Sequence, residues 1–175
     1  MDDTLLPRVQ KPSRYLGSEL NAVRAGRAGR AVHVGLAFPD LYEIGMSHLG
    51  LGLLYHSLNR SSRVRAERVF LPAPDLQALL RERRTPLSTL ESRTALHRLD
   101  ILGFTLAYEL TYTNVLAILD LGGIPLRSGE RSRGHPLVIA GGPCAFNPEP
   151  LSAFVDAFVI GEAELRLPEI CDRVA

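Results

Sequence analysis

The chain has 175 residues, 46% of them hydrophobic, and its 20 basic and 19 acidic side chains leave a net charge of +1. This length suffices for one domain with a hydrophobic core. The charge gives no reason to expect a nucleic-acid partner, and no apolar run approaches the roughly 18 residues that span a bilayer. The acidic N-terminus lacks the bases of a signal peptide, and the two cysteines show no CxxC spacing. We therefore expect a cytoplasmic protein without disulfides or a cysteine zinc site.

The first 30 residues differ from the rest in being mostly basic. Leu16, Leu20 and Val23 have the spacing of a short helix with an apolar stripe. Two interpretations stay open for this arm: a loosely packed leader, as chain termini often are, or a segment that docks on another domain or subunit. Residues 25–30, Ala-Gly-Arg-Ala-Gly-Arg, have the composition of a flexible link into a domain formed by residues 31–175.

Strand and helix patterns alternate from residue 31 onward. Apolar, β-branched runs predict six strands, of which 87–90 has the weakest pattern. Amphipathic runs predict helices, with Ser47 and Asp75 as N-caps of the first two and Gly122 at the end of the third. This alternation predicts an α/β fold, a Rossmann-like (flavodoxin-like) three-layer sandwich with a mostly parallel sheet of five or six strands. The predicted strands are 31–38, 69–71, 87–90, 100–106, 137–140 and 154–160, and the predicted helices are 47–59, 76–83, 110–121 and 162–173.

Glycine-rich or polar segments follow four of the predicted strands. Gly141-Gly142-Pro143 comes after the strand at 137–140, and Gly161 ends the last strand. A glycine at such a turn lets a ligand or another backbone approach closely, because it has no Cβ. Parallel strands end at one edge of a sheet, so we expect these turns to converge there with the loop 39–48 and with Thr105. Ligands of open α/β sheets bind at this edge, and the sequence therefore predicts a binding crevice.

Single residues near this edge have two interpretations each. His48 opens a predicted helix, whose N-terminus favours the neutral imidazole that binds a metal or ligand; otherwise it is a surface or capping histidine. Glu162 and Glu164 lie in the first turn of the last helix, where carboxylates stabilise the helix dipole. Alternatively, the Gly161-Glu162 pair contacts a ligand hydroxyl or a neighbouring domain.

Independent catalysis has little support in the sequence. Glu43 and Glu109 have no evident acid or base partner, and Cys144 has no evident histidine partner. A small autonomous enzyme using Glu109 or Cys144 remains a weaker alternative. The glycine fingerprints of nicotinamide dehydrogenases and P-loop proteins are absent.

Several runs of the sequence resemble the N-terminal domain of cobalamin-binding-type radical S-adenosylmethionine (radical SAM) proteins, in particular a bacterial subfamily of uncharacterised proteins that open with this domain. These runs are 12–19, 38–50, 100–104, 108–116 and 140–164. The resemblance covers nearly the whole chain and implies a cobalamin-binding fold, with the corrin over the carboxyl ends of the strands.

The resemblance also implies which residues hold the cofactor. Gly141 and Gly142 would flank the nucleotide tail of cobalamin, Thr105 would place a hydroxyl beside the tail, and Gly161 would allow a close approach. No metal ligand is predicted. The full predicted cofactor-binding set is Tyr42, Gly45, Ser47, His48, Thr105, Gly141, Gly142, Pro143, Gly161 and Glu162.

The chain departs from its relatives in two motifs. Cobalamin mutases and methyltransferases have Asp-x-His-x-x-Gly after the first strand. Here Met46 stands at the position of the aspartate, two residues before His48, and Leu51 stands at the position of the glycine, three residues after it. Without the aspartate that orients a cobalt-bound imidazole, we expect cobalamin to be held without a protein ligand to cobalt, or binding to be lost.

The second departure is the Cys-x-x-x-Cys-x-x-Cys signature of radical SAM proteins, which this chain lacks. A radical SAM barrel, in cis or in trans, would then supply the 4Fe-4S cluster and S-adenosylmethionine. We expect the chain to be a fragment, a split gene product or a truncated chain that is inactive alone. The alternative is a non-catalytic, Rossmann-like interaction domain that docks the barrel and has lost cobalamin binding.

Overall fold

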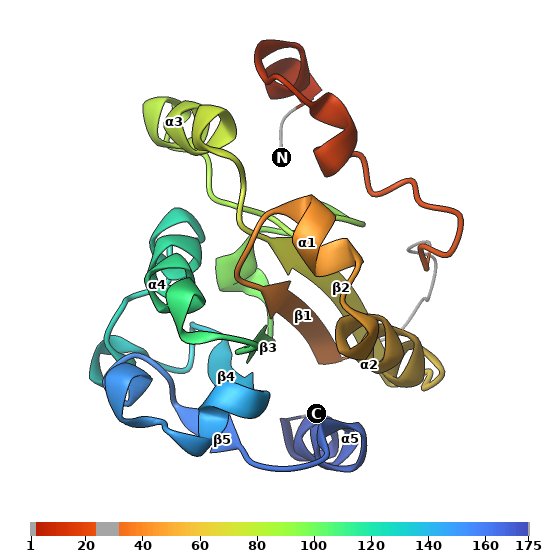
Figure 1. The fold of residues 1–175 in the computed structure, drawn as a ribbon, viewed down its shortest axis with the longest axis vertical. Coiled ribbons are helices and arrows are strands. Elements are labelled where there is room, and N and C mark those ends of the chain that lie inside the picture. The colour runs from red at the N-terminus through yellow and green to blue at the C-terminus, as the bar shows by residue number, and fades with distance from the viewer. Residues whose placement is uncertain (1–2, 24–31, 175) are drawn as a thin grey trace.

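The computed structural model describes residues 3–23 and 32–174, and within them five strands form a single parallel sheet. The strands lie in the order β2-β1-β3-β4-β5 (Figure 1). Their bounds are β1 (Val32–Phe38), β2 (Val64–Phe70), β3 (Ile101–Thr105), β4 (Leu137–Gly141) and β5 (Ala157–Val159).

Helices cover both faces of the sheet. Helices α3 (Pro74–Arg83) and α4 (Tyr112–Leu121) lie on one face, and α2 (Leu49–Asn59) and α5 (Ala163–Val174) lie on the other (Figure 1). The short helix α1 (Tyr42–Met46) precedes α2. The predicted Rossmann-like, three-layer fold is therefore confirmed. Short 3₁₀ helices occupy Asp3–Arg8, Pro12–Tyr15, Leu96–Arg98, Glu109–Thr111, Ser128–Glu130, Pro143–Phe146 and Glu149–Leu151.

Each face of the sheet has its own hydrophobic core. Neighbouring residues of a strand point to opposite faces, so Leu102 packs beneath α3 and α4 while Ile101 packs beneath α2. Burial on both faces explains why β1, β3 and β4 are almost continuously apolar. The chain leaves β1 toward α2 and leaves β3 toward α4, so the strand order reverses between these two neighbours, and ligands of such folds bind at the carboxyl edge near this point.

Two strand predictions were wrong. Residues 87–90 form no strand; one antiparallel bridge joins Ser88 to Ala95, and Leu87 and Leu90 enter the core from a loop. β2 begins at Val64, five residues before its predicted start. The charged residues of this strand hid its first half, because their side chains are buried and paired rather than solvated.

The N-terminal end of α2 also differs from the prediction. Within the expected loop 39–48, residues Tyr42–Met46 form the helix α1. Ser47 follows that helix instead of capping α2. His48 is the N-cap, since its Nδ1 accepts a hydrogen bond from the Leu51 amide at 3.2 Å. Asp75 lies inside the first turn of α3, whose N-cap is Ala73.

The described part of the arm packs on the domain itself. Leu5 and Val9 are buried in the same core as Leu76 of α3. The predicted helix with an apolar stripe is wrong, because residues 16–23 are not helical and Leu20 is fully exposed. Residues 25–30, predicted to form a link, lie outside the described residues. None of the described helices combines the length and the hydropathy that crossing a membrane requires.

Candidate functional site

A cavity of about 180 Å³ opens at the carboxyl edge of the sheet, on the face covered by α2 and α5. It brings together six of the predicted residues, from the turns that follow β1, β3, β4 and β5. The predicted convergence of these turns is therefore present in the structure. These six residues are His48, Thr105, Gly141, Gly142, Pro143 and Gly161.

The two glycines with a positive φ have different roles in this cavity. Gly142 has φ +104°, and a Cβ there would lie 2.9 Å from the carbonyl oxygen of Leu106. The same Leu106 oxygen accepts a hydrogen bond from the Cys144 amide, so the bare Gly142 backbone serves the close contact between the turns after β3 and β4. Gly161 has φ +95°, but a Cβ there would meet nothing within 4 Å. The space beside Gly161 is open to a ligand.

His48 is held in a state that opposes metal binding. Its Nδ1 accepts the Leu51 amide hydrogen bond, so a neutral ring carries its proton on Nε2. The ring also packs on Phe38, with 4.9 Å between the ring centroids. A cobalt ion needs the lone pair of a deprotonated nitrogen, and here one nitrogen is occupied and the other is protonated. His48 is suited to donate a hydrogen bond into the cavity.

Four predicted residues do not line this cavity. Ser47 donates a hydrogen bond to the Ile44 carbonyl at 2.7 Å and is exposed. Gly45 is buried against β2, where a Cβ would overlap with the Phe70 ring. Glu162 lies outside the lining, whereas Glu164, two residues later and also exposed, is part of it.

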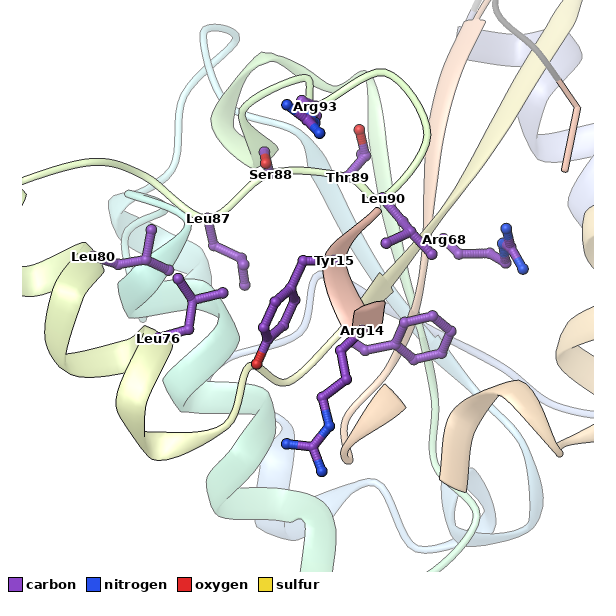
Figure 2. Close-up of a pocket in the computed structure, with 11 residues that line it drawn as sticks. Arg14, Tyr15, Arg68, Leu76, Leu80, Leu87, Ser88, Thr89, Leu90 and Arg93 are labelled. Atoms are coloured by element: carbon purple, nitrogen blue, oxygen red, sulfur yellow. The ribbon is translucent and has the colours of Figure 1, made fainter. Parts of the chain in front are cut away.

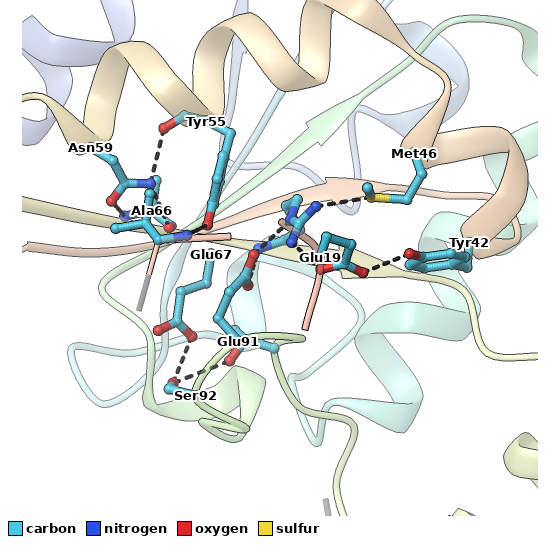
Figure 3. A network of polar contacts seen from close by, with 12 residues as sticks. Glu19, Tyr42, Met46, Tyr55, Asn59, Ala66, Glu67, Glu91 and Ser92 are labelled. Carbon is cyan, nitrogen blue, oxygen red and sulfur yellow. Dashed lines mark hydrogen bonds and ion pairs between the residues drawn. The ribbon is translucent and has the colours of Figure 1, made fainter. Parts of the chain in front are cut away.

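Tyr42, the fourth, belongs to a buried ionic network (Figure 3). Its hydroxyl donates to Glu19 at 2.6 Å, and Glu19 also pairs with Arg68 at 2.7 Å. Burial, together with the bond to Glu19, raises the pKa of Tyr42 to about 12, so this phenol stays protonated. Arg68 further pairs with Glu91 at 2.6 Å and donates to the Met46 sulfur at 3.0 Å. The network anchors the arm to β2 and to α1, which is a structural role.

Sequence reasoning missed several residues of the lining. Gly50 and Leu54 of α2 line the cavity, as do Ala163, Glu164 and Leu167 of α5. The spacing of 163, 164 and 167 is that of one helix face, a signal that the sequence did contain.

A second cavity, of only about 30 Å³, lies beneath the arm (Figure 2). The Tyr15 ring occupies much of this region, next to Leu76 and Leu80 of α3 (Figure 2). The Tyr15 hydroxyl accepts a hydrogen bond from the Ala73 amide at 3.1 Å. A space of this size holds water rather than a ligand.

Of the residues considered for independent catalysis, Glu43 is paired with Arg14 at 2.8 Å, and Glu109 lies beside Cys144. Burial raises the pKa of the Cys144 thiol, and the neighbouring Glu109 raises it further, so the thiol is protonated at neutral pH. Within residues 3–23 and 32–174, no three His, Cys, Asp or Glu side chains are grouped as a metal site.

A family model described as radical SAM proteins, N-terminal, matches residues 50–175 of the chain. The chain belongs to this family. The part of this radical SAM N-terminal domain that matches begins within α2 and contains β2 to β5. It therefore includes Thr105, Gly141, Gly142 and Glu164, whereas His48 precedes it.

Three chains of solved structures match as well. One is a 1.5 Å crystal structure of a novel cobalamin-binding protein from Desulfitobacterium hafniense DCB-2, which is 16% identical to this chain, with a TM-score of 0.49. The match covers 83% of this chain and 60% of that one, so this radical SAM N-terminal domain spans less than two thirds of that chain's length. The curated proteins contain no match.

Proposed function

We propose that the domain binds a cobalamin-type cofactor for a radical SAM enzyme, with the nucleotide tail of the cofactor in the cavity between α2 and α5. The observation that carries this proposal is the cavity itself. It lies at the carboxyl edge of a parallel sheet, in a chain that belongs to the radical SAM N-terminal family, and its walls are mostly glycine and apolar side chains.

The residues present fit the tail of the cofactor better than its metal centre. The cavity of about 180 Å³ is smaller than the roughly 300–1,000 Å³ typical of a site for a whole ligand, so it suits one flat part of a larger molecule. Gly161 leaves open space beside the turn after β5, and Thr105 offers a hydroxyl. When bound, cobalamin would supply a reactive cobalt centre.

His48 would orient the cofactor without binding cobalt. The hydrogen bond from the Leu51 amide occupies Nδ1 and leaves Nε2–H as a donor. The cofactor would therefore be held by the surrounding walls, which agrees with the missing Asp-x-His-x-x-Gly motif. The role of Thr105 would be to bond the tail from the β3 side.

The iron-sulfur cluster and S-adenosylmethionine would be held by a radical SAM barrel, in cis or in trans. The sequence has two cysteines, Cys144 and Cys171, and the cluster signature requires three. Burial raises the pKa of Cys171 to about 11, so this thiol is protonated and unsuited to metal binding. The present chain would contribute the cofactor rather than the radical-generating step.

Titration with hydroxocobalamin tests the proposal. The wild-type chain should shift the visible bands of the cofactor and co-elute with it. Ala163→Trp, which fills the mouth of the cavity from the first turn of α5, should weaken binding at least tenfold. Ala153→Trp, an exposed change in the β4–β5 connection, should bind as the wild type does. A folded wild-type chain that neither shifts the spectrum nor co-elutes would refute the proposal.

A second candidate function is an interaction module that docks the barrel and holds no corrinoid. It is favoured by exposed apolar side chains beside the cavity: Leu49 is 76% exposed and Leu165 is 69% exposed. This candidate predicts that a separately expressed radical SAM domain binds the chain, that Leu165→Glu weakens the association, and that hydroxocobalamin does not bind.

A further inference from the structure

The cavity between α2 and α5 is lined by few polar side chains. Of the described residues that line it, only His48, Thr105 and Glu164 have polar side chains, and no lysine or arginine is among them. The neutral His48 ring offers a donor at Nε2, Thr105 offers a hydroxyl, and a carboxylate such as Glu164 only accepts. The lining therefore suits a ligand group that donates a hydrogen bond and carries no negative charge.

Glu164 is positioned at the cavity by the start of α5. Gly161 turns the chain at φ +95°, and α5 begins at Ala163. Ala163, Glu164 and Leu167 then share one face of the helix, and all three line the cavity. Within residues 3–23 and 32–174, Glu164 has no hydrogen-bond or ion-pair partner. Its carboxylate is exposed, so its acceptor capacity is met by water and becomes available to a ligand that displaces this water.

Glu162 differs from Glu164 in place but not in charge. Both carboxylates lie at the N-terminus of α5, where a negative charge interacts favourably with the helix dipole. Both are exposed, but Glu162 precedes the helix and lies outside the lining. Stabilisation of the dipole accounts for both residues equally, whereas contact with the cavity distinguishes Glu164.

We propose that Glu164 is a specificity residue of this site, which accepts a hydrogen bond from a hydroxyl or N–H of a flat, uncharged, nucleoside-like group in the cavity. This inference rests on the proposed function for its choice of ligand. For a corrinoid, the group recognised is the nucleoside of the tail, and the carboxylate opposes entry of the phosphate.

The test compares two corrinoids and three variants of the full chain. Hydroxocobalamin carries the nucleotide tail and cobinamide lacks it. Glu164→Ala removes the acceptor, Glu164→Gln keeps an acceptor oxygen without the charge, and Glu162→Ala is the matched control on the same turn. Dissociation constants are measured by calorimetry or by the visible spectrum.

Glu164→Ala should weaken hydroxocobalamin binding about tenfold, the loss expected for one hydrogen bond to a charged acceptor. Glu164→Gln should restore part of that loss, and Glu162→Ala should match the wild type. The affinity for cobinamide should be the same in all four chains.

Three results would overturn the inference. If Glu164→Ala binds hydroxocobalamin as tightly as the wild type, Glu164 is not a specificity residue, although the proposed function stands. The same holds if Glu162→Ala and Glu164→Ala weaken binding equally, because the cause is then the charge of the helix end. A wild-type chain that binds neither corrinoid overturns the proposed function and, with it, the ligand class named here.

Discussion

At the scale of single residues, two adjacent buried charges in β2 hide this strand from sequence analysis. Glu67 and Arg68 are 2% and 6% exposed, which is rare for charged residues unless they are paired. Glu67 meets His33 at 3.2 Å and accepts a hydrogen bond from Ser92 at 2.6 Å, while Arg68 pairs with Glu19 and Glu91. Arg68 is therefore satisfied from outside β2, whereas Glu67 also pairs with Arg65 of the same strand at 2.6 Å.

Glu67 should make the stability of the domain depend on pH. Burial alone would raise its pKa, but the neighbouring His33 ring and the hydrogen bond from Ser92 outweigh burial and lower the pKa to about 2. Because the folded-state pKa lies below the unfolded value, the stabilisation is complete above about pH 4.5 and is lost as the pH falls toward 2. A shift of this size corresponds to about 3 kcal/mol.

Glu67→Gln should therefore reduce the free energy of unfolding at pH 7, by up to about 3 kcal/mol, with a difference from the wild type that shrinks below pH 4. Urea denaturation at several pH values measures both effects. Glu82→Gln is the control, since the exposed Glu82–Arg8 pair should contribute less than about 1 kcal/mol. A difference between Glu67→Gln and wild type that stays constant down to pH 2 would contradict the linkage.

At the scale of elements, one glycine in α1 and one in α2 differ in what surrounds them. Gly45 of α1 is pressed against the Phe70 ring of β2, so its lack of a Cβ sets how closely this helix packs on the sheet. Gly52 of α2 faces open space, since a Cβ there would meet nothing within 4 Å. A glycine inside a helix has an entropic cost, which contact with β2 offsets only at Gly45.

Alanine at these two positions should act in opposite directions. Gly45→Ala forces α1 away from Phe70 and should destabilise the domain by about 1–3 kcal/mol. Gly52→Ala should stabilise it by about 0.5–1 kcal/mol, because alanine favours the helix and meets no obstacle. Chemical denaturation of both variants measures the pair. Equal effects, or stabilisation by Gly45→Ala, would show that α1 does not pack on β2 in this way.

At the scale of the whole molecule, exposed apolar side chains gather at the carboxyl edge of the sheet. Large apolar residues follow β1, β3, β4 and β5, and they are exposed around the turns that form the cavity. Such an accumulation is typical of a surface that a partner covers. These residues are Leu49, Leu110, Phe146, Ile160 and Leu165.

The chain should therefore self-associate in isolation near neutral pH, where its net charge of +1 provides little repulsion. The double variant Leu49→Glu/Leu165→Glu should shift light-scattering masses toward the monomer. The control Leu126→Glu/Leu20→Glu adds the same charge at exposed apolar positions away from the turns of the cavity. A wild-type chain that stays monomeric at high concentration would contradict the expectation, as would equal relief by the control pair.

Much of the fold could be predicted because its signals are local. The apolar runs of β1, β3 and β4 and the stripe of Leu51, Tyr55 and Leu58 in α2 are properties of short segments. β2 and the 87–90 segment could not be predicted in this way. Most partners of the buried charges in β2 are distant in the sequence, and Leu87 and Leu90 are buried without pairing in a ladder.

Short-range patterns in the chain were sufficient for the layered α/β fold, and for the meeting of the turns at one edge, because parallel strands end together. Tertiary packing decided the rest. It assigned Tyr42 to the Arg68 network and brought Glu164 rather than Glu162 to the cavity. These outcomes depend on the rotation and spacing of whole helices against the sheet, which distant contacts determine.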